Sequence, residues 1–96
     1  MNIAGVIIDA VLSEDLLASV EATGHKLISF SNLAEARNSG AAMIFVEWTE
    51  GPHLVQLVRD LQAKVEDGAV PVVVLATGGS IGAMRRARAA GAVDVL

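Results

Sequence analysis

Short apolar runs alternate along the chain with segments whose apolar residues recur every three or four positions. Several of the short runs are uninterrupted and β-branched, which is typical of strands buried on both faces of a sheet. The other segments have the spacing of amphipathic helices. We therefore expect strands at residues 3–8, 25–30, 41–46, 71–76 and 93–96, with a helix in each interval.

Residues that begin and end helices lie at suitable places between these runs. Ser13 is placed to cap the first helix, with Glu14 and Asp15 in its first turn, and Pro52 suits the start of the third. A short second helix is expected at 32–37. Glycines that favour a helix stop follow the four segments, at Gly24, Gly40, Gly68 and Gly91. The expected apolar stripes are Leu16, Leu17 and Val20; Leu54, Leu57, Val58, Leu61 and Val65; and Ile81, Met84 and Ala87.

The order βαβαβαβαβ predicts an α/β fold, a doubly wound five-stranded parallel sheet with right-handed crossovers and helices on both faces. With 96 residues the chain is long enough for one small domain, which we place at 1–96. The residues are 53% hydrophobic but only 3% aromatic, so the interior must be aliphatic.

Charge and cysteine content exclude several classes of function. The formal net charge of −4 argues against a protein that binds nucleic acid by neutralising phosphates. The chain has no cysteine, which excludes disulfides and thiolate chemistry. No signal peptide and no apolar run of membrane-spanning length is evident. We expect a soluble cytoplasmic protein with no membrane partner.

Candidate chemistry lies where the expected strands end, because ligands of open α/β sheets bind at the carboxyl edge. The first strand leads to Asp9, the third runs into Glu47 within "FVEWTEG", and the fourth leads to Thr77. Two carboxylates and a hydroxyl are therefore expected to converge on one edge. Each taken singly could also be an ordinary solvated loop residue.

This ordered set of elements resembles the receiver domain of two-component response regulators, over essentially the whole chain. "VLAT" at 74–77 and "ARAAGAVDVL" at 87–96 are similar to the family's fourth strand and to its fourth helix, turn and fifth strand. The resemblance implies the strand order 2-1-3-4-5. It places Asp9 on the acidic pair that holds Mg²⁺, Glu47 on the phosphoacceptor and Thr77 on the switch hydroxyl. It also implies a protein partner such as a histidine kinase or an output domain.

Departures from the family pattern point to a degenerate pseudo-receiver. Ala10 stands at the second acidic position, so Mg²⁺ binding should be weak at best and we expect no cofactor. Glu47 is one methylene longer than Asp, which moves its oxygens by about 1.5 Å and argues against phosphotransfer. The loop after Glu47 is short and has no proline. We therefore expect a non-catalytic signalling module, not an enzyme.

Two interpretations of Glu47 stay open at this point. Its carboxylate could mimic the phosphorylated state, with Thr77 as its partner, or the switch could simply be lost.

The end of the sequence carries a further expectation. The chain stops at Leu96, before the lysine and the last helix that the family resemblance implies. We expect the uncovered face near Val93 and Val95 to be bare and to favour a homo-oligomer or a docked protein. The alternative is a fragment of a longer protein.

Other features offer secondary hypotheses. The loop "ATGGSIG" brings Gly78, Gly79 and Ser80 between a strand and a helix, where backbone N–H groups could bind an anion. The alternative function is accordingly a small phosphate-ligand-binding protein or enzyme using residues 77–80.

Three arginines and one tryptophan complete the candidates. The arginines form a cluster that is either a solvated face or a docking surface for an acidic helix, at Arg85, Arg86 and Arg88. Trp48 could be a core residue, a lid or a recognition anchor. No histidine pattern predicts a metal site.

Overall fold

A computed structural model describes residues 2–7, 9–48, 52–62, 70–75, 81–92 and 94–95, with the side chains of residues 52 and 53 excepted. Strands and helices alternate along the chain as the sequence predicts. Their bounds are β1 (Asn2–Val6), α1 (Ala10–Ala22), β2 (Lys26–Ser29), α2 (Leu33–Arg37), β3 (Met43–Glu47), α3 (Pro52–Gln62), β4 (Val72–Leu75), α4 (Ile81–Ala90) and β5 (Asp94–Val95).

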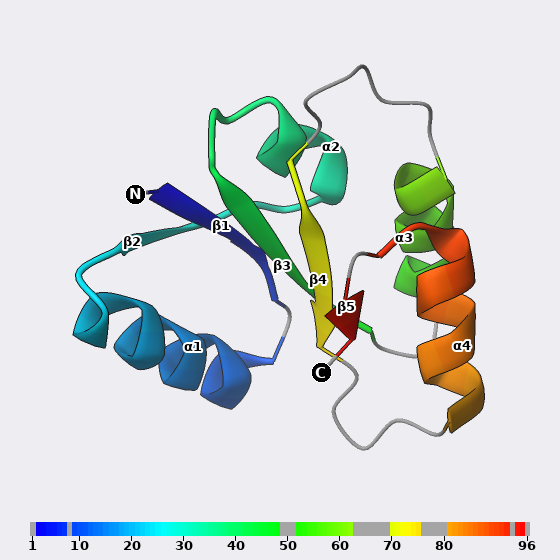
Figure 1. Cartoon of the computed structure of the whole chain (residues 1–96), viewed down its shortest axis with the longest axis horizontal. Helices are drawn as coiled ribbons and strands as arrows, with labels where there is room; N and C mark the ends of the chain where they lie inside the picture. The colour runs from blue at the N-terminus through cyan, green and yellow to red at the C-terminus, as the bar shows by residue number, and fades with distance from the viewer. Residues whose placement is uncertain are drawn as a thin grey trace.

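The strands form one parallel sheet in the order β2-β1-β3-β4-β5, which confirms the predicted fold class and strand order (Figure 1). The β1 strand lies between β2 and β3, and Val6 is in register with Val46. Parallel pairing brings all the carboxyl ends to the same edge. The ends of β1 and β3 are therefore neighbours although they are far apart in the sequence.

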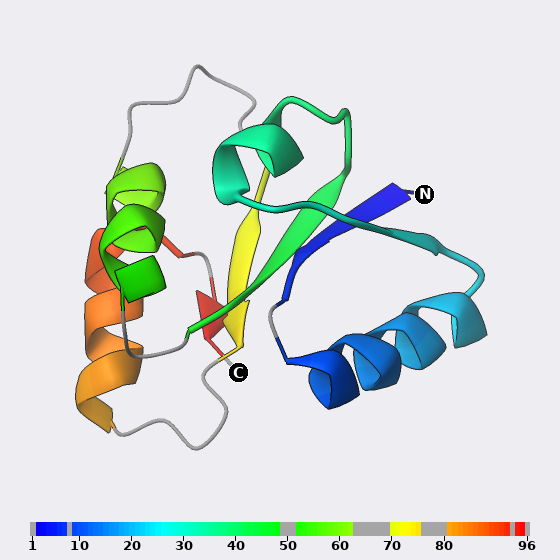
Figure 2. The same ribbon diagram turned by 180° about the vertical axis from the view of Figure 1, so that it is seen from behind.

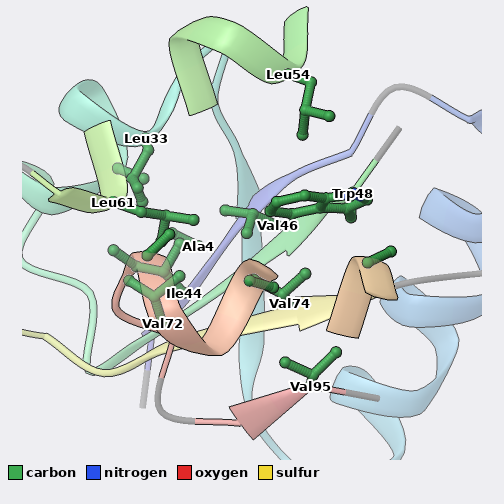
Figure 3. Close-up of a cluster of buried hydrophobic side chains, with 14 of the residues drawn as sticks. Ala4, Leu33, Ile44, Val46, Trp48, Leu54, Leu61, Val72, Val74 and Val95 are labelled. Atoms are coloured by element: carbon green, nitrogen blue, oxygen red, sulfur yellow. The ribbon is translucent and has the colours of Figure 1, made fainter. Parts of the chain in front are cut away.

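One face of the sheet carries the main hydrophobic core, which α2, α3 and α4 cover (Figures 1 and 3). Ile44, Val46 and Trp48 occupy alternate positions along β3 and just beyond it, so their side chains point to this same face. The next strand contributes Val72 and Val74. Ile44, Val46 and Val74 have no measurable exposure, so this face excludes water.

The opposite face is packed by α1. A Cβ placed on Gly5 would lie 3.3 Å from Leu27 Cδ1 and 3.9 Å from Leu16 Cδ2. Leu16 belongs to α1, so this helix approaches β1 and β2 closely where glycine leaves room. Helices thus lie on both faces, as predicted.

The α1 helix begins at Ala10, and the prediction that Ser13 caps it is wrong. Asp9 is the N-cap: its backbone is extended, and its Oδ1 accepts a hydrogen bond from the Leu12 N–H. The Ser13 N–H donates to the Asp9 carbonyl at 2.9 Å, as the first α-helical bond. Ser13 therefore already lies inside the first turn. The predicted stop is confirmed, because Gly24 has φ +80° directly after the Thr23 C-cap.

The apolar stripes of α1 and α3 are largely confirmed. Leu54 and Leu61 are buried, and Leu57 and Val58 are half-buried against the core, whereas Val65 and Gly68 lie outside the described residues. In the first helix Val20 is buried and Leu16 is half-buried. Leu17 is 39% exposed, so it lies at the margin of the stripe.

The α4 helix confirms two of the three residues of its predicted stripe, because Ala87 is buried and Met84 is half-buried against the core, but the prediction for Ile81 is wrong. Its inward residues are Ala83, Ala87 and Ala90, whereas Ile81 is 70% exposed. Small side chains on this face let the helix approach its neighbours closely. At its end, Gly91 has φ +126°, and a Cβ there would lie 3.0 Å from the Leu61 carbonyl oxygen.

The expectation of a bare β5 at Val95 is also wrong. Val95 is only 9% exposed, because it points into the core on the face that α2, α3 and α4 cover (Figure 3). Val93 lies outside the described residues. Across the described segments, no helix combines the length and the apolar character that crossing a membrane requires.

Candidate functional site

The ends of β1 and β3 bring the two predicted acids together at the carboxyl edge of the sheet. The backbone N–H of Asp9 donates a hydrogen bond to Glu47 Oε2 at 3.1 Å, across 38 positions of sequence. The contact follows from the pairing of the two strands, which places Val6 opposite Val46. Asp9 and Glu47 therefore meet at this edge, through the backbone of Asp9 and the side chain of Glu47.

The Asp9 carboxylate is used within its own helix. Its Oδ1 accepts the Leu12 N–H at 2.9 Å, which satisfies one of the donors that the first turn leaves without a helical partner. The backbone N–H of Asp9 therefore bonds to Glu47, whereas its side chain caps α1. The sequence pointed to Asp9 as an acid of the site, but not to this capping role.

Glu47 is the last residue of β3 and is half-buried opposite Leu75 of β4. Its carboxylate accepts a hydrogen bond immediately before the first turn of α1. The N-terminus of a helix carries a partial positive charge, so a carboxylate is stabilised there. Glu47 consequently joins β3 to the start of α1, which an ordinary solvated loop acid would not do.

The remaining residues of the predicted edge site lie outside the described residues. They are Thr77, Gly78, Gly79 and Ser80. The Thr77 hydroxyl as a partner of Glu47 therefore stays a prediction, as does the anion-binding loop.

Trp48 is a core residue, which settles the choice among core, lid and exposed anchor. It is 5% exposed, and its backbone N–H donates to the Leu75 carbonyl at 2.9 Å, continuing the β3–β4 ladder by one bond. The Arg86 guanidinium carbon lies 5.4 Å from the centroid of its ring, which is a cation–π geometry. The residue after Glu47 is thereby in contact with α4.

This contact between Trp48 and Arg86 was missed from the sequence. The two residues are far apart along the chain, and no local spacing rule connects them. A basic cluster and a single tryptophan were each visible, but only the packing of α4 over the end of β3 brings them together.

The described side chains fit a divalent cation poorly. Mg²⁺ prefers several oxygen ligands, including one or two carboxylates. Here one Asp9 oxygen accepts a backbone hydrogen bond, as does one Glu47 oxygen, and Ala10 supplies no side-chain oxygen. Within the described segments, no three His, Cys, Asp or Glu side chains gather closely enough to hold a metal ion.

The arginine cluster on α4 is solvent-exposed and makes different contacts at each position. Arg88 pairs with Asp94 at 3.3 Å, with 63% and 54% of the two side chains exposed. Arg86 reaches Trp48 as described, and Arg85 is exposed. Exposed ion pairs contribute little stability. The docking surface at these arginines stays a prediction.

Comparisons with known proteins place this geometry in a fold family. No protein-family model matches the sequence, and neither does any curated protein. Solved structures do match. A candidate response regulator from Chloroflexus aurantiacus has a TM-score of 0.79 and 18% identity, over 99% of this chain and 82% of that chain.

Two further structures give the same result. The receiver domain of a sensor histidine kinase from Pseudomonas aeruginosa, with magnesium coordinated in its active-site cleft, has a TM-score of 0.76 and 19% identity. A response regulator from Thermotoga maritima has a TM-score of 0.75 and 23% identity. Both matches cover 99% of this chain and 82% of the other. The chain therefore has the fold of response-regulator receiver domains, which confirms the resemblance predicted from its sequence.

Proposed function

We propose that this protein is a non-catalytic signalling module, a pseudo-receiver that acts through protein–protein contacts, with Glu47 in place of the phosphoacceptor. The observation that carries the proposal is the hydrogen bond from the Asp9 N–H to Glu47 Oε2. This bond holds the Glu47 carboxylate, a permanent negative charge, at the edge of the sheet. The family resemblance implies a transient charge there, that of a phosphoryl group.

The side chains at this edge support a regulatory role over phosphotransfer. A phosphoacceptor needs a carboxylate oxygen free to attack and a metal ion to neutralise the charge that develops. Here an oxygen of each acid accepts a backbone hydrogen bond, and Ala10 removes one carboxylate from the implied metal site. The Pseudomonas receiver domain holds magnesium in its cleft, so the two proteins would differ at this step.

Charge and contacts favour the mimic over a decayed switch. A carboxylate near the positive end of α1 places negative charge beside the helix N-terminus, as a phosphoryl group would, although with less charge and fewer acceptor oxygens. Glu47 also precedes Trp48, which contacts Arg86 of α4. In this proposal a change at the edge would reach the exposed face of α4 through these adjacent residues, where a partner would sense it.

Phosphorylation chemistry tests the proposal. Wild-type protein and Glu47→Asp would be incubated with Mg²⁺ and a small acyl phosphate donor, then analysed by intact mass. We expect no phosphoryl adduct on the wild type, because the longer side chain misplaces its oxygens. An adduct on wild-type Glu47 would refute the proposal. Glu47→Gln is the matched control, since it keeps the length but cannot form an acyl phosphate.

Titration with phosphorylated metabolites tests the alternative function, a phosphate-ligand site at residues 77–80. Saturable NMR shifts at Thr77, Gly78 and Gly79 would favour that function. Their absence, together with an unmodified wild type, is the result we expect.

A further inference from the structure

The exposed faces of α1 and α4 have opposite charge. The α1 stripe is defined here as Val11, Glu14, Asp15 and Ala18, which recur at helical spacing and are all exposed. The α4 stripe is defined as Ile81, Arg85 and Arg88, which are exposed at the same kind of spacing. The acidic residues of α1 are Glu14, Asp15 and Glu21, and it has no basic residue; α4 has three arginines and no acid.

Each stripe also begins with a large exposed apolar side chain. Val11 is 67% exposed and Ile81 is 70% exposed, which makes them the two most exposed large hydrophobic residues of the described segments. Covering an exposed apolar group with another surface removes it from water and is favourable in free energy. Each stripe therefore combines an apolar residue with charges of one sign.

The two stripes are unable to meet within one molecule. Figures 1 and 2 show α1 and α4 on opposite sides of the molecule, with the sheet between them. We propose that the α4 stripe of one molecule docks on the α1 stripe of a second copy of this chain. The surfaces differ, so the contact is head-to-tail and generates a ring or an open chain of molecules.

The spacing of the stripes gives the arrangement of the two helices. Arg85 lies four residues after Ile81, about 6 Å along the axis of α4, while Glu14 and Asp15 lie three and four residues after Val11, about 4.5 and 6 Å along the axis of α1. A side-by-side, parallel alignment therefore places Val11 near Ile81 and both acids near Arg85. Ala18 then lies opposite Arg88, where its small side chain leaves room for the guanidinium group.

Affinity and salt dependence follow from this geometry. A single helix against a single helix buries less surface than a stable dimer needs, so the association is weak and reversible. Its charged part weakens as salt screens the exposed groups. This inference shares with the proposed function the exposed face of α4 as a contact surface. It involves neither Glu47 nor Asp9, so its failure would leave the phosphorylation result unaffected.

Sedimentation equilibrium tests the contact through charge reversal. The wild type should show a mass that rises with protein concentration and falls with added salt. Arg85→Glu alone, or Glu14→Arg with Asp15→Arg, should weaken association by about tenfold or more, because like charges then face each other. Mixing the two variants should restore it. Arg59→Glu is the matched control for Arg85→Glu, since Arg59 is exposed on α3 outside both stripes and its reversal changes the net charge by the same amount.

Three results would overturn the inference: a wild type that stays monomeric at every concentration, a loss of association with Arg59→Glu as large as with Arg85→Glu, or no recovery on mixing. Circular dichroism would establish that each variant folds. If a variant does not fold, NMR of the wild type replaces it. Dilution should then shift the amides of α1 and α4, and shifts confined to other elements would contradict the contact.

Discussion

Removal of the Glu47 side chain should destabilise the protein measurably. Glu47→Ala deletes the acceptor of the Asp9 N–H and the negative charge beside the start of α1. Hydrogen bonds to charged groups contribute about 1.5–3 kcal/mol, and this one lies in the exposed part of the structure, so the lower end applies. The charge itself adds about 0.3–1 kcal/mol at a helix N-terminus.

An opposing effect reduces this total. The chain carries a formal charge of −4, so losing one acid relieves some repulsion. We expect a net loss of about 1–2 kcal/mol in the free energy of unfolding. For a domain of this size that lowers the Tm by roughly 5–15 °C. Glu47→Gln keeps an acceptor oxygen and should cost less, about 0.5–1 kcal/mol.

Thermal and urea unfolding followed by circular dichroism would measure these losses. Glu14→Ala is the control, because it removes an exposed acid of α1 that lies in the second turn. Its effect should stay within about 0.5 kcal/mol. If Glu47→Ala proves as stable as the wild type, or more stable, then Glu47 is a solvated loop acid and the reasoning about the edge of the sheet fails.

Three further predictions test separate parts of the structure. Asp9→Ala should cost about 0.5–2 kcal/mol through the lost N-cap, whereas Ser13→Ala should cost less; equal losses in urea unfolding would contradict the helix start observed here. Ile44→Ala should cost about 2–5 kcal/mol because the side chain is fully buried, and Ile81→Ala should be nearly neutral in the same assay. Arg86→Ala should change the fluorescence of the single tryptophan and cost about 0.5–1 kcal/mol, and an unchanged emission spectrum would argue against the stacking contact.

Local pattern determined the elements of this protein and their order. Several of the strand-forming runs are uninterrupted and apolar, and the order of strands and helices, with right-handed crossovers, leaves few possible sheets. Gly24 and Gly91 marked helix ends because the backbone there takes a positive φ, which side chains disfavour. Even the meeting of Asp9 and Glu47 was predictable, since parallel strands bring their carboxyl ends to one edge.

Only the tertiary structure decided how individual side chains are used. Asp9 and Ser13 are both residue types that can cap a helix. In the structure the helix starts after Asp9, whose backbone N–H bonds to Glu47. Ile81 was assigned to the core by its spacing, but α4 packs through its alanines. The contact of Arg86 with Trp48 likewise depends on packing between distant segments. Periodicity shows which positions of a helix are apolar. The rotation of the helix about its axis depends on how its side chains pack against the neighbouring sheet and helices.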